Sequence, residues 1–189
     1  MKKFFTLLAV MFLSYSLFAQ EHLDFRGVPI DGQLTDFLSK MEAMGYSVAS
    51  KDDNVVTMKG KFTNRDAELF IIATPVTKVV WKVIVDFDKA TSWESLKSSY
   101  FEYKNLYITK YGKPKNDFEY FKKPYYEGDG YELQALRKEK CTYATYFETP
   151  NGYVAVKLTS FECLRIAYED NINSELDTRE KTSSALNEI

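Results

Sequence analysis

Few residues of this chain could do chemistry, and histidine is the scarcest of them. His22 is the only histidine among the 189 residues. A Ser-His-Asp or Cys-His arrangement would have to use it, yet it lies just after a predicted export signal, where we expect a mobile terminus. A zinc site usually draws on several His and Cys ligands, and the chain has one His and two Cys. The sequence therefore predicts no metal site, no bound cofactor and no catalytic residue.

Carboxylates are the only plentiful catalytic groups, with 27 Asp and Glu in the chain. A glycosidase needs two of them, roughly 5 to 10 Å apart. Asp86 and Asp88 share a strand face and would lie about 6 to 7 Å apart. The plainer interpretation is a solvated strand end beside Lys82 and Lys89. A carboxylate-based hydrolase stays open as an alternative function.

Aromatic residues make up 16% of the chain, and five of them gather in the segment 113–130, which proline and glycine interrupt. Loops longer than about 15 residues are uncommon in compact domains and are often functional. A short edge strand over 118–121 is the alternative. Aromatic side chains anchor protein interfaces and stack on the apolar faces of sugars. The candidate ligand- or partner-binding residues are therefore Phe118, Tyr120, Phe121, Tyr125 and Tyr126.

Cys141 and Cys163 are the only cysteines, and an exported protein sits where disulfides persist. Strand alternation gives Cys141 the parity of Tyr143, whereas Cys163 has the parity opposite to Leu164. The two thiols would then face different sides of a sheet, and a bridge requires Cα atoms within about 7 Å. A disulfide between them remains an open possibility.

Residues 1–19 have the pattern of a cleaved export signal. Lys2 and Lys3 precede an apolar run from Phe4 to Phe18, and Ala19 is a small residue before the expected cut at Gln20. We expect a periplasmic or secreted protein with no membrane span after cleavage. Loss of the two lysines changes the formal charge from −2 to −4, and without a basic run we expect no nucleic-acid partner.

The strongest structural signal is a hairpin over residues 67–88. In its second strand Trp81, Val83, Val85 and Phe87 alternate with a mixed set, as on a strand with one face on a core. We expect Trp81 to be buried and the exposed face to carry Val80, Lys82 and Ile84. Core positions predicted by the same periodicities are Leu38, Trp81, Val83, Leu96 and Val156.

The whole pattern predicts an α+β fold, in which helices cover one face of an antiparallel meander of about seven strands. The expected order is α-β-β-β-β-α-α-β-β-β. A single domain over 20–170 would contain two helix-plus-meander units, 28–112 and 129–170. The polar segment 171–189 fits either a frayed helix or a disordered tail.

This succession resembles the tandem helix–sheet domains of β-lactamase-inhibitor-like and outer-membrane-assembly lipoprotein-like proteins. The opening Gly27–Gly32 and the helix ending Lys110–Pro114 also look like those of small uncharacterised exported proteins of Gram-negative bacteria. The resemblance implies a fold and carries no site residue. We expect a non-enzymatic binding module for a protein of the cell envelope, with carbohydrate binding through 118–126 as the alternative.

The first prediction concerns export. The protein recovered from its native host should have an intact mass corresponding to a chain that begins near Gln20, because the signal is removed during export. Mass spectrometry of the envelope fraction measures this. Retention of residues 1–19 in a membrane fraction would contradict it.

Overall fold

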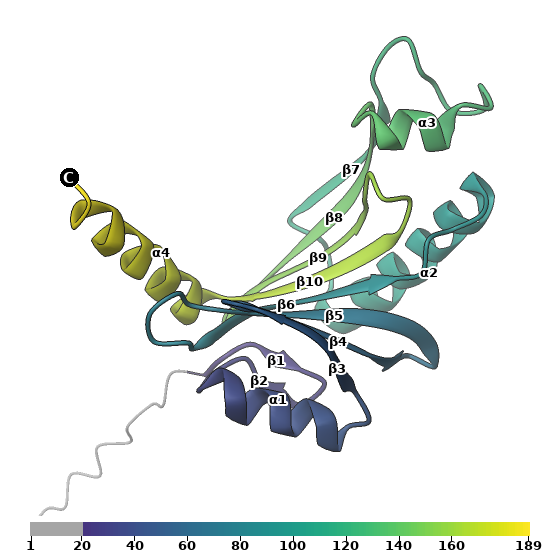
Figure 1. Ribbon diagram of the computed structural model, residues 1–189. Coiled ribbons are helices and arrows are strands. Elements are labelled where there is room, and N and C mark those ends of the chain that lie inside the picture. The colour runs from purple at the N-terminus through teal and green to yellow at the C-terminus, as the bar shows by residue number, and fades with distance from the viewer. Residues whose placement is uncertain (1–20) are drawn as a thin grey trace, which may run out of the picture.

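A computed structural model describes residues 21–189, and the predicted export signal at 1–19 lies outside them. The fold is α+β, as predicted, with a large antiparallel sheet, a two-stranded hairpin and four helices among the described residues (Figure 1). No helix within 21–189 has the length and apolar character needed to cross a membrane.

The elements follow the predicted succession closely. The hairpin strands are β1 (Asp24–Phe25) and β2 (Val28–Pro29). The strands of the large sheet are β3 (Ser47–Asp52), β4 (Val55–Phe62), β5 (Arg65–Ala73), β6 (Val80–Phe87), β7 (Asn116–Phe121), β8 (Cys141–Thr149), β9 (Gly152–Leu158) and β10 (Leu164–Asp170). The helices are α1 (Leu34–Ala43), α2 (Trp93–Tyr111), α3 (Glu132–Arg137) and α4 (Asn171–Leu186).

The large sheet consists of two four-strand meanders that meet at its centre. Its order is β3-β4-β5-β6-β10-β9-β8-β7, and every neighbouring pair is antiparallel. The central seam pairs β6 with β10, for example Ile84 with Ala167. A helix precedes each meander, α1 the first and α2 the second. A helix followed by four strands thus occurs twice, although α3 lies between β7 and β8 in the second case. The outermost strands are β3 and β7.

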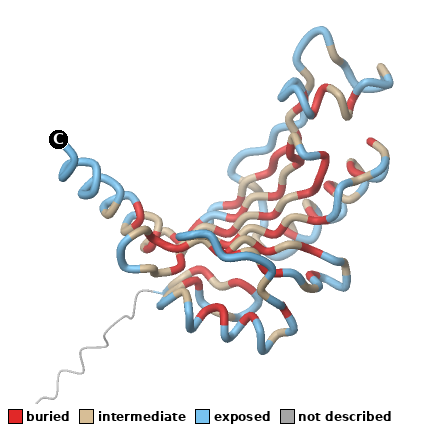
Figure 2. Tube along the Cα trace, viewed as in Figure 1, coloured by how far each residue is buried: buried red, intermediate tan, exposed pale blue. Residues whose placement is uncertain are grey.

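One face of the sheet, called here the inner face, carries the core. Alternate residues of the strands point to it and pack with α1 and α2 in one apolar cluster. Helix α2 contributes Leu96, Tyr100 and Tyr103 to this core, and all three are buried. The burial predicted for Leu38, Leu96, Val83 and Val156 is confirmed. Figure 2 shows the buried positions concentrated between the sheet and these helices.

The sheet has eight strands rather than about seven, because residues 116–121 form an edge strand. β7 pairs along β8 from Asn116 opposite Tyr146 to Phe121 opposite Cys141. The alternative of an edge strand near 118–121 is therefore the one realised. Pairing with β8 satisfies the backbone of β7 on one side, which an isolated loop could not achieve.

Trp81 is only partly buried, so its predicted place in the core is wrong. Ile72 pairs with Lys82 and Ala73 with Val80, which leaves Trp81 as an extra residue in β6. Such a β-bulge reverses the alternation beyond it. As a result Val80 is fully buried, although we expected it on the exposed face.

The amino-terminal segment is held in place, contrary to the predicted mobile terminus. His22 Nδ1 lies 3.1 Å from Asp170 Oδ1, and the amide of Leu23 donates to Asp170 Oδ2 at 2.8 Å. Phe25 is fully buried and stacks on Phe62 at 5.7 Å between ring centroids. Sequence patterning missed these contacts because all of them are long-range.

Most of the segment 171–189 is helical, which is one of the two alternatives left open. The Asp170 carboxylate caps α4 by accepting a hydrogen bond from the amide of Asn173 at 2.9 Å. Asn173 and Asp177 are the buried residues of this helix. Beyond them α4 is largely exposed and projects away from the sheet (Figures 1 and 2).

The second prediction concerns Asp170, whose side chain is fully buried. Asp170→Ala should lower the free energy of unfolding by about 3 kcal/mol or more, because it leaves several buried donors without an acceptor. Urea unfolding of the purified protein measures this. Asp66→Ala is the control: that residue is exposed on β5, and loss of its carboxylate should cost less than about 0.5 kcal/mol. Equal losses for the two variants would contradict the proposed importance of Asp170.

Candidate functional site

The face of the sheet opposite α1 and α2, called here the outer face, is the candidate functional surface. Its side chains alternate along the strands with those of the core. They form rows that cross the strands, because the strands pair in continuous register. Near the seam, α4 packs beside β6 and β10, with Lys181 over the Trp81 ring. At the other end of this face, Leu136 of α3 lines a hollow with Tyr146 and Lys157.

An apolar row runs across the middle of the outer face. Successive cross-strand pairs join five residues on β8, β9, β10, β6 and β5. They are Tyr146, Ala155, Ala167, Ile84 and Phe70, and each is partly exposed. At about 4.8 Å between strands, this row is about 20 Å long. An uncovered apolar row of this length on a sheet face is a feature of interaction surfaces.

Charged residues flank the apolar row on both sides, and most of them are paired across strands. Arg165 donates to both carboxylate oxygens of Asp86, at 2.6 Å from Nε and 2.5 Å from Nη2. On the other side Lys82 Nζ lies 2.9 Å from Glu169. The Asp86 contacts raise the pKa of Arg165. Both ion pairs bridge β6 and β10, so they stabilise the seam as well as shape the surface.

The five predicted aromatic residues do not form one surface. Phe118 and Tyr120, each 43% exposed, lie on the exposed edge strand β7. Phe121 instead packs edge-on against Trp93, with 5.7 Å between ring centroids. Tyr125 packs against the core, while Tyr126 is 65% exposed. Strand alternation and the turn after β7 thus divide the set between core and surface.

Sequence reasoning missed two tyrosines of the outer face. Tyr146 lies opposite Ala155, and its ring is 6.2 Å from that of Phe118 in an edge-on arrangement. Tyr153 is 39% exposed and donates to Glu148 at 3.0 Å. Alternation against the apolar positions of the same strands could have identified both. Both tyrosines lie outside the segment 113–130, to which the predicted binding residues were confined.

The two cysteines are free and buried, so the disulfide left open by the sequence is not formed in this structure. Burial raises the pKa of the Cys141 thiol to about 12. Cys163 Sγ lies 3.0 Å from Thr159 Oγ1, and burial raises its pKa too. Neither thiol has the lowered pKa of a reactive cysteine.

The two carboxylates proposed from the sequence, Asp86 and Asp88, have different surroundings. Asp86 is held by Arg165, and Asp88 is exposed. Of the buried acids, Glu162 is held by Lys89 and Arg137. The contact with Lys89, together with the nearby Arg137 charge, lowers the pKa of Glu162. Within residues 21–189 no group of three or more His, Cys, Asp or Glu side chains is placed to hold a metal ion.

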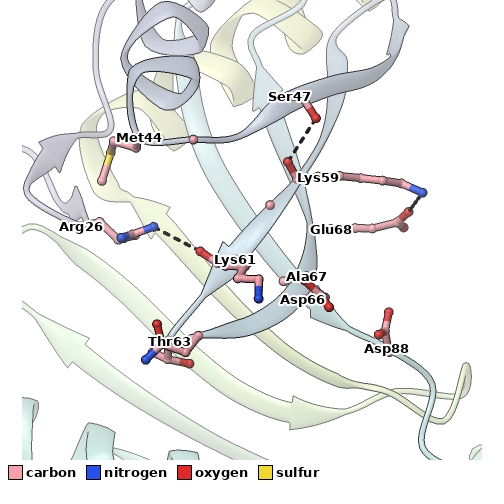
Figure 3. Close-up of a pocket in the computed structure, with 13 residues that line it drawn as sticks. Arg26, Met44, Ser47, Lys59, Lys61, Thr63, Asp66, Ala67, Glu68 and Asp88 are labelled. Carbon is pink, nitrogen blue, oxygen red and sulfur yellow. Dashed lines mark hydrogen bonds and ion pairs between the residues drawn. The ribbon is translucent and has the colours of Figure 1, made fainter.

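A hollow of about 850 Å³ lies beside the outer edge of β4, where β3 no longer covers that strand (Figure 3). Arg26 Nη1 reaches the carbonyl oxygen of Lys61 at 3.3 Å, and Lys59 Nζ lies 3.1 Å from Glu68. Arg26 and Lys59 are therefore engaged within the protein, and the Lys61 side chain is exposed. These contacts cover the edge of β4 and do not indicate a ligand site.

No protein-family model, no curated protein and no solved structure matches this chain. The case for a function therefore depends on the geometry of the described residues.

The third prediction separates the two tyrosines of the turn after β7. Tyr125→Ala should lower the melting temperature by about 3 °C or more, since a ring packed on the core is lost and 1 kcal/mol corresponds to about 2–4 °C at this size. Tyr126→Ala should leave it within about 1 °C, because that ring is exposed. Calorimetry of the two variants measures the difference. Equal shifts would show that the turn contributes as a unit.

Proposed function

We propose that the protein is an exported, non-enzymatic interaction module that binds another protein of the cell envelope through its outer face. The observation that carries this proposal is the apolar row from Tyr146 to Phe70, which lies uncovered between two rows of charge. Apolar centres with polar rims are the usual anatomy of protein interfaces.

The shape of the surface favours a protein over a small ligand. A row of about 20 Å on a sheet face can contribute to a patch of about 800 Å² per partner, the size of an ordinary protein interface. Small ligands instead bind in concave sites that bury most of their surface. The paired charges Arg165–Asp86 and Lys82–Glu169 hold the face in one geometry before binding, which lowers the entropic cost of association.

The two alternatives have weaker support in the structure. A sugar platform on 118–126 needs several rings on one side, yet Phe121 and Tyr125 pack inward. A hydrolase needs two neighbouring carboxylates free to act, and Asp86 is bound to Arg165. The envelope location rests on the export signal proposed from the sequence at 1–19.

The fourth prediction tests the outer face by site-specific photo-crosslinking in the native host. A benzoylphenylalanine probe replacing Tyr120 should give a discrete cross-linked protein. The same probe replacing Leu106 should not. Leu106 is a matched control because it is 52% exposed against 43% for Tyr120 and lies on α2, the helix that covers the inner face.

Cross-linking should be detected by immunoblot of whole cells and identified by mass spectrometry. Probes at both positions that capture the same proteins in similar amounts would show non-specific contact. A specific product from Leu106 alone would place the interaction on the helical side and overturn the proposal.

A further inference from the structure

Lys157 is the one cation of the central strands β6, β9 and β10 that has no partner among the described residues. These strands carry Lys82, Lys157 and Arg165 as their only Lys or Arg side chains. Lys82 is paired with Glu169, and Arg165 is held by Asp86 through two hydrogen bonds. Lys157 lies directly beside Arg165 in the sheet, so a like charge is its neighbour.

The Lys157 side chain is partly shielded from solvent, and part of its surroundings is apolar. It is half-buried, and its neighbour on β8 is the buried Ala144. Burial lowers the pKa of Lys157, and the nearby charges of Arg165 and Lys82 lower it further, whereas the Asp86 carboxylate, which is bound to Arg165, raises it. The free energy of its charged form would therefore fall if a carboxylate were placed beside it.

A hollow of about 310 Å³ is lined in part by Lys157. Its lining residues include Lys157, Thr142, Tyr146, Arg165 and Phe161, together with one acidic residue, the exposed Glu139. Phe161, at its rim, is 72% exposed. The hollow also adjoins the apolar row, because Tyr146 belongs to both. A charged group and an apolar group that are neighbours in a partner could therefore bind here together.

We propose that Lys157 binds a carboxylate side chain, Asp or Glu, of the protein partner, with an apolar residue beside that acid packed against Tyr146. This inference rests on the proposed function and names the chemistry of the partner at the outer face. The ion pair would give the partner its register across the sheet, as charges at interfaces commonly do.

A carboxylate fits this position better than a phosphate does. One free ammonium can match one carboxylate in charge, whereas phosphate sites usually gather several donors with an Arg fork. The only Arg beside Lys157, Arg165, has its fork occupied by Asp86. The mature chain is also acidic overall, so long-range attraction would not draw a polyanion to this face.

The test begins with nuclear magnetic resonance titration of the mature protein. The probe is a blocked pentapeptide with glutamate between leucine and phenylalanine, compared with the same peptide carrying glutamine. We expect the glutamate peptide to shift the Lys157 ammonium and Tyr146 ring signals and to raise the Lys157 pKa. The glutamine peptide should bind about tenfold more weakly.

Lys157→Met removes the charge and keeps an apolar stem, so it should abolish the difference between the peptides. Lys59→Met is the matched control, since Lys59 lies on the same outer face and is paired with Glu68. It should leave the difference unchanged. Sodium acetate is titrated as well: binding as tight as that of the peptide would assign the site to small carboxylates and overturn the proposal.

A second measurement separates this inference from the proposed function. The Tyr120 photo-crosslink is repeated in the Lys157→Met background, and we expect at least about a tenfold loss of product. An unchanged product would overturn the role of Lys157 while leaving the outer face as the interaction surface. Absence of a specific product already with Lys157 present would overturn the proposed function itself.

Discussion

The buried carboxylate of Asp170 is the contact on which much of this architecture depends. It lies at the end of β10, where it accepts hydrogen bonds from His22 and the amides of Leu23 and Asn173. The side-chain amide of Asn173 then donates to the carbonyl oxygens of Ile30 and Val80, both at 3.0 Å. One capping interaction therefore joins the amino-terminal segment, β6, β10 and α4. A buried charge requires this degree of hydrogen bonding to be tolerated.

This junction sits at the seam between the two meanders, and the outer face crosses that seam. The rows depend on the register of β6 against β10, which pairs Ile84 with Ala167. The strands pack closely at this end of the sheet, where a Cβ at Gly152 would lie 2.1 Å from the carbonyl oxygen of Glu169. Only glycine fits at this position. The core contacts on the inner face, the Asp170 junction and the paired charges on the outer face all fix one register. A slip by a single residue would exchange the two faces.

The two faces of the sheet differ in what covers them. The inner face is covered by helices and supplies the apolar burial that stabilises the fold. The apolar row of the outer face has no covering layer, and cross-strand ion pairs hold the side chains on either side of it in place. At the edge strand β7, Lys104 of α2 reaches Asp117 and Glu119, and charges on an edge discourage pairing with other chains. The structure thus leaves one sheet face exposed while limiting contact at its β7 edge.

The sequence by itself determined the fold class, most helix and strand positions and most of the core, because hydrophobic periodicity is local and covers whole elements. It could not determine what depends on distant partners. Strand β7 forms because it pairs with β8. A bulge places Trp81 partly outside the core. His22 is held by a carboxylate 148 residues away. The candidate site was predicted only in part, since its apolar row exists only when five strands lie in register. Only the tertiary structure shows that Lys157 has no ion-pair partner within residues 21–189, because ion pairing depends on which side chains the sheet brings together.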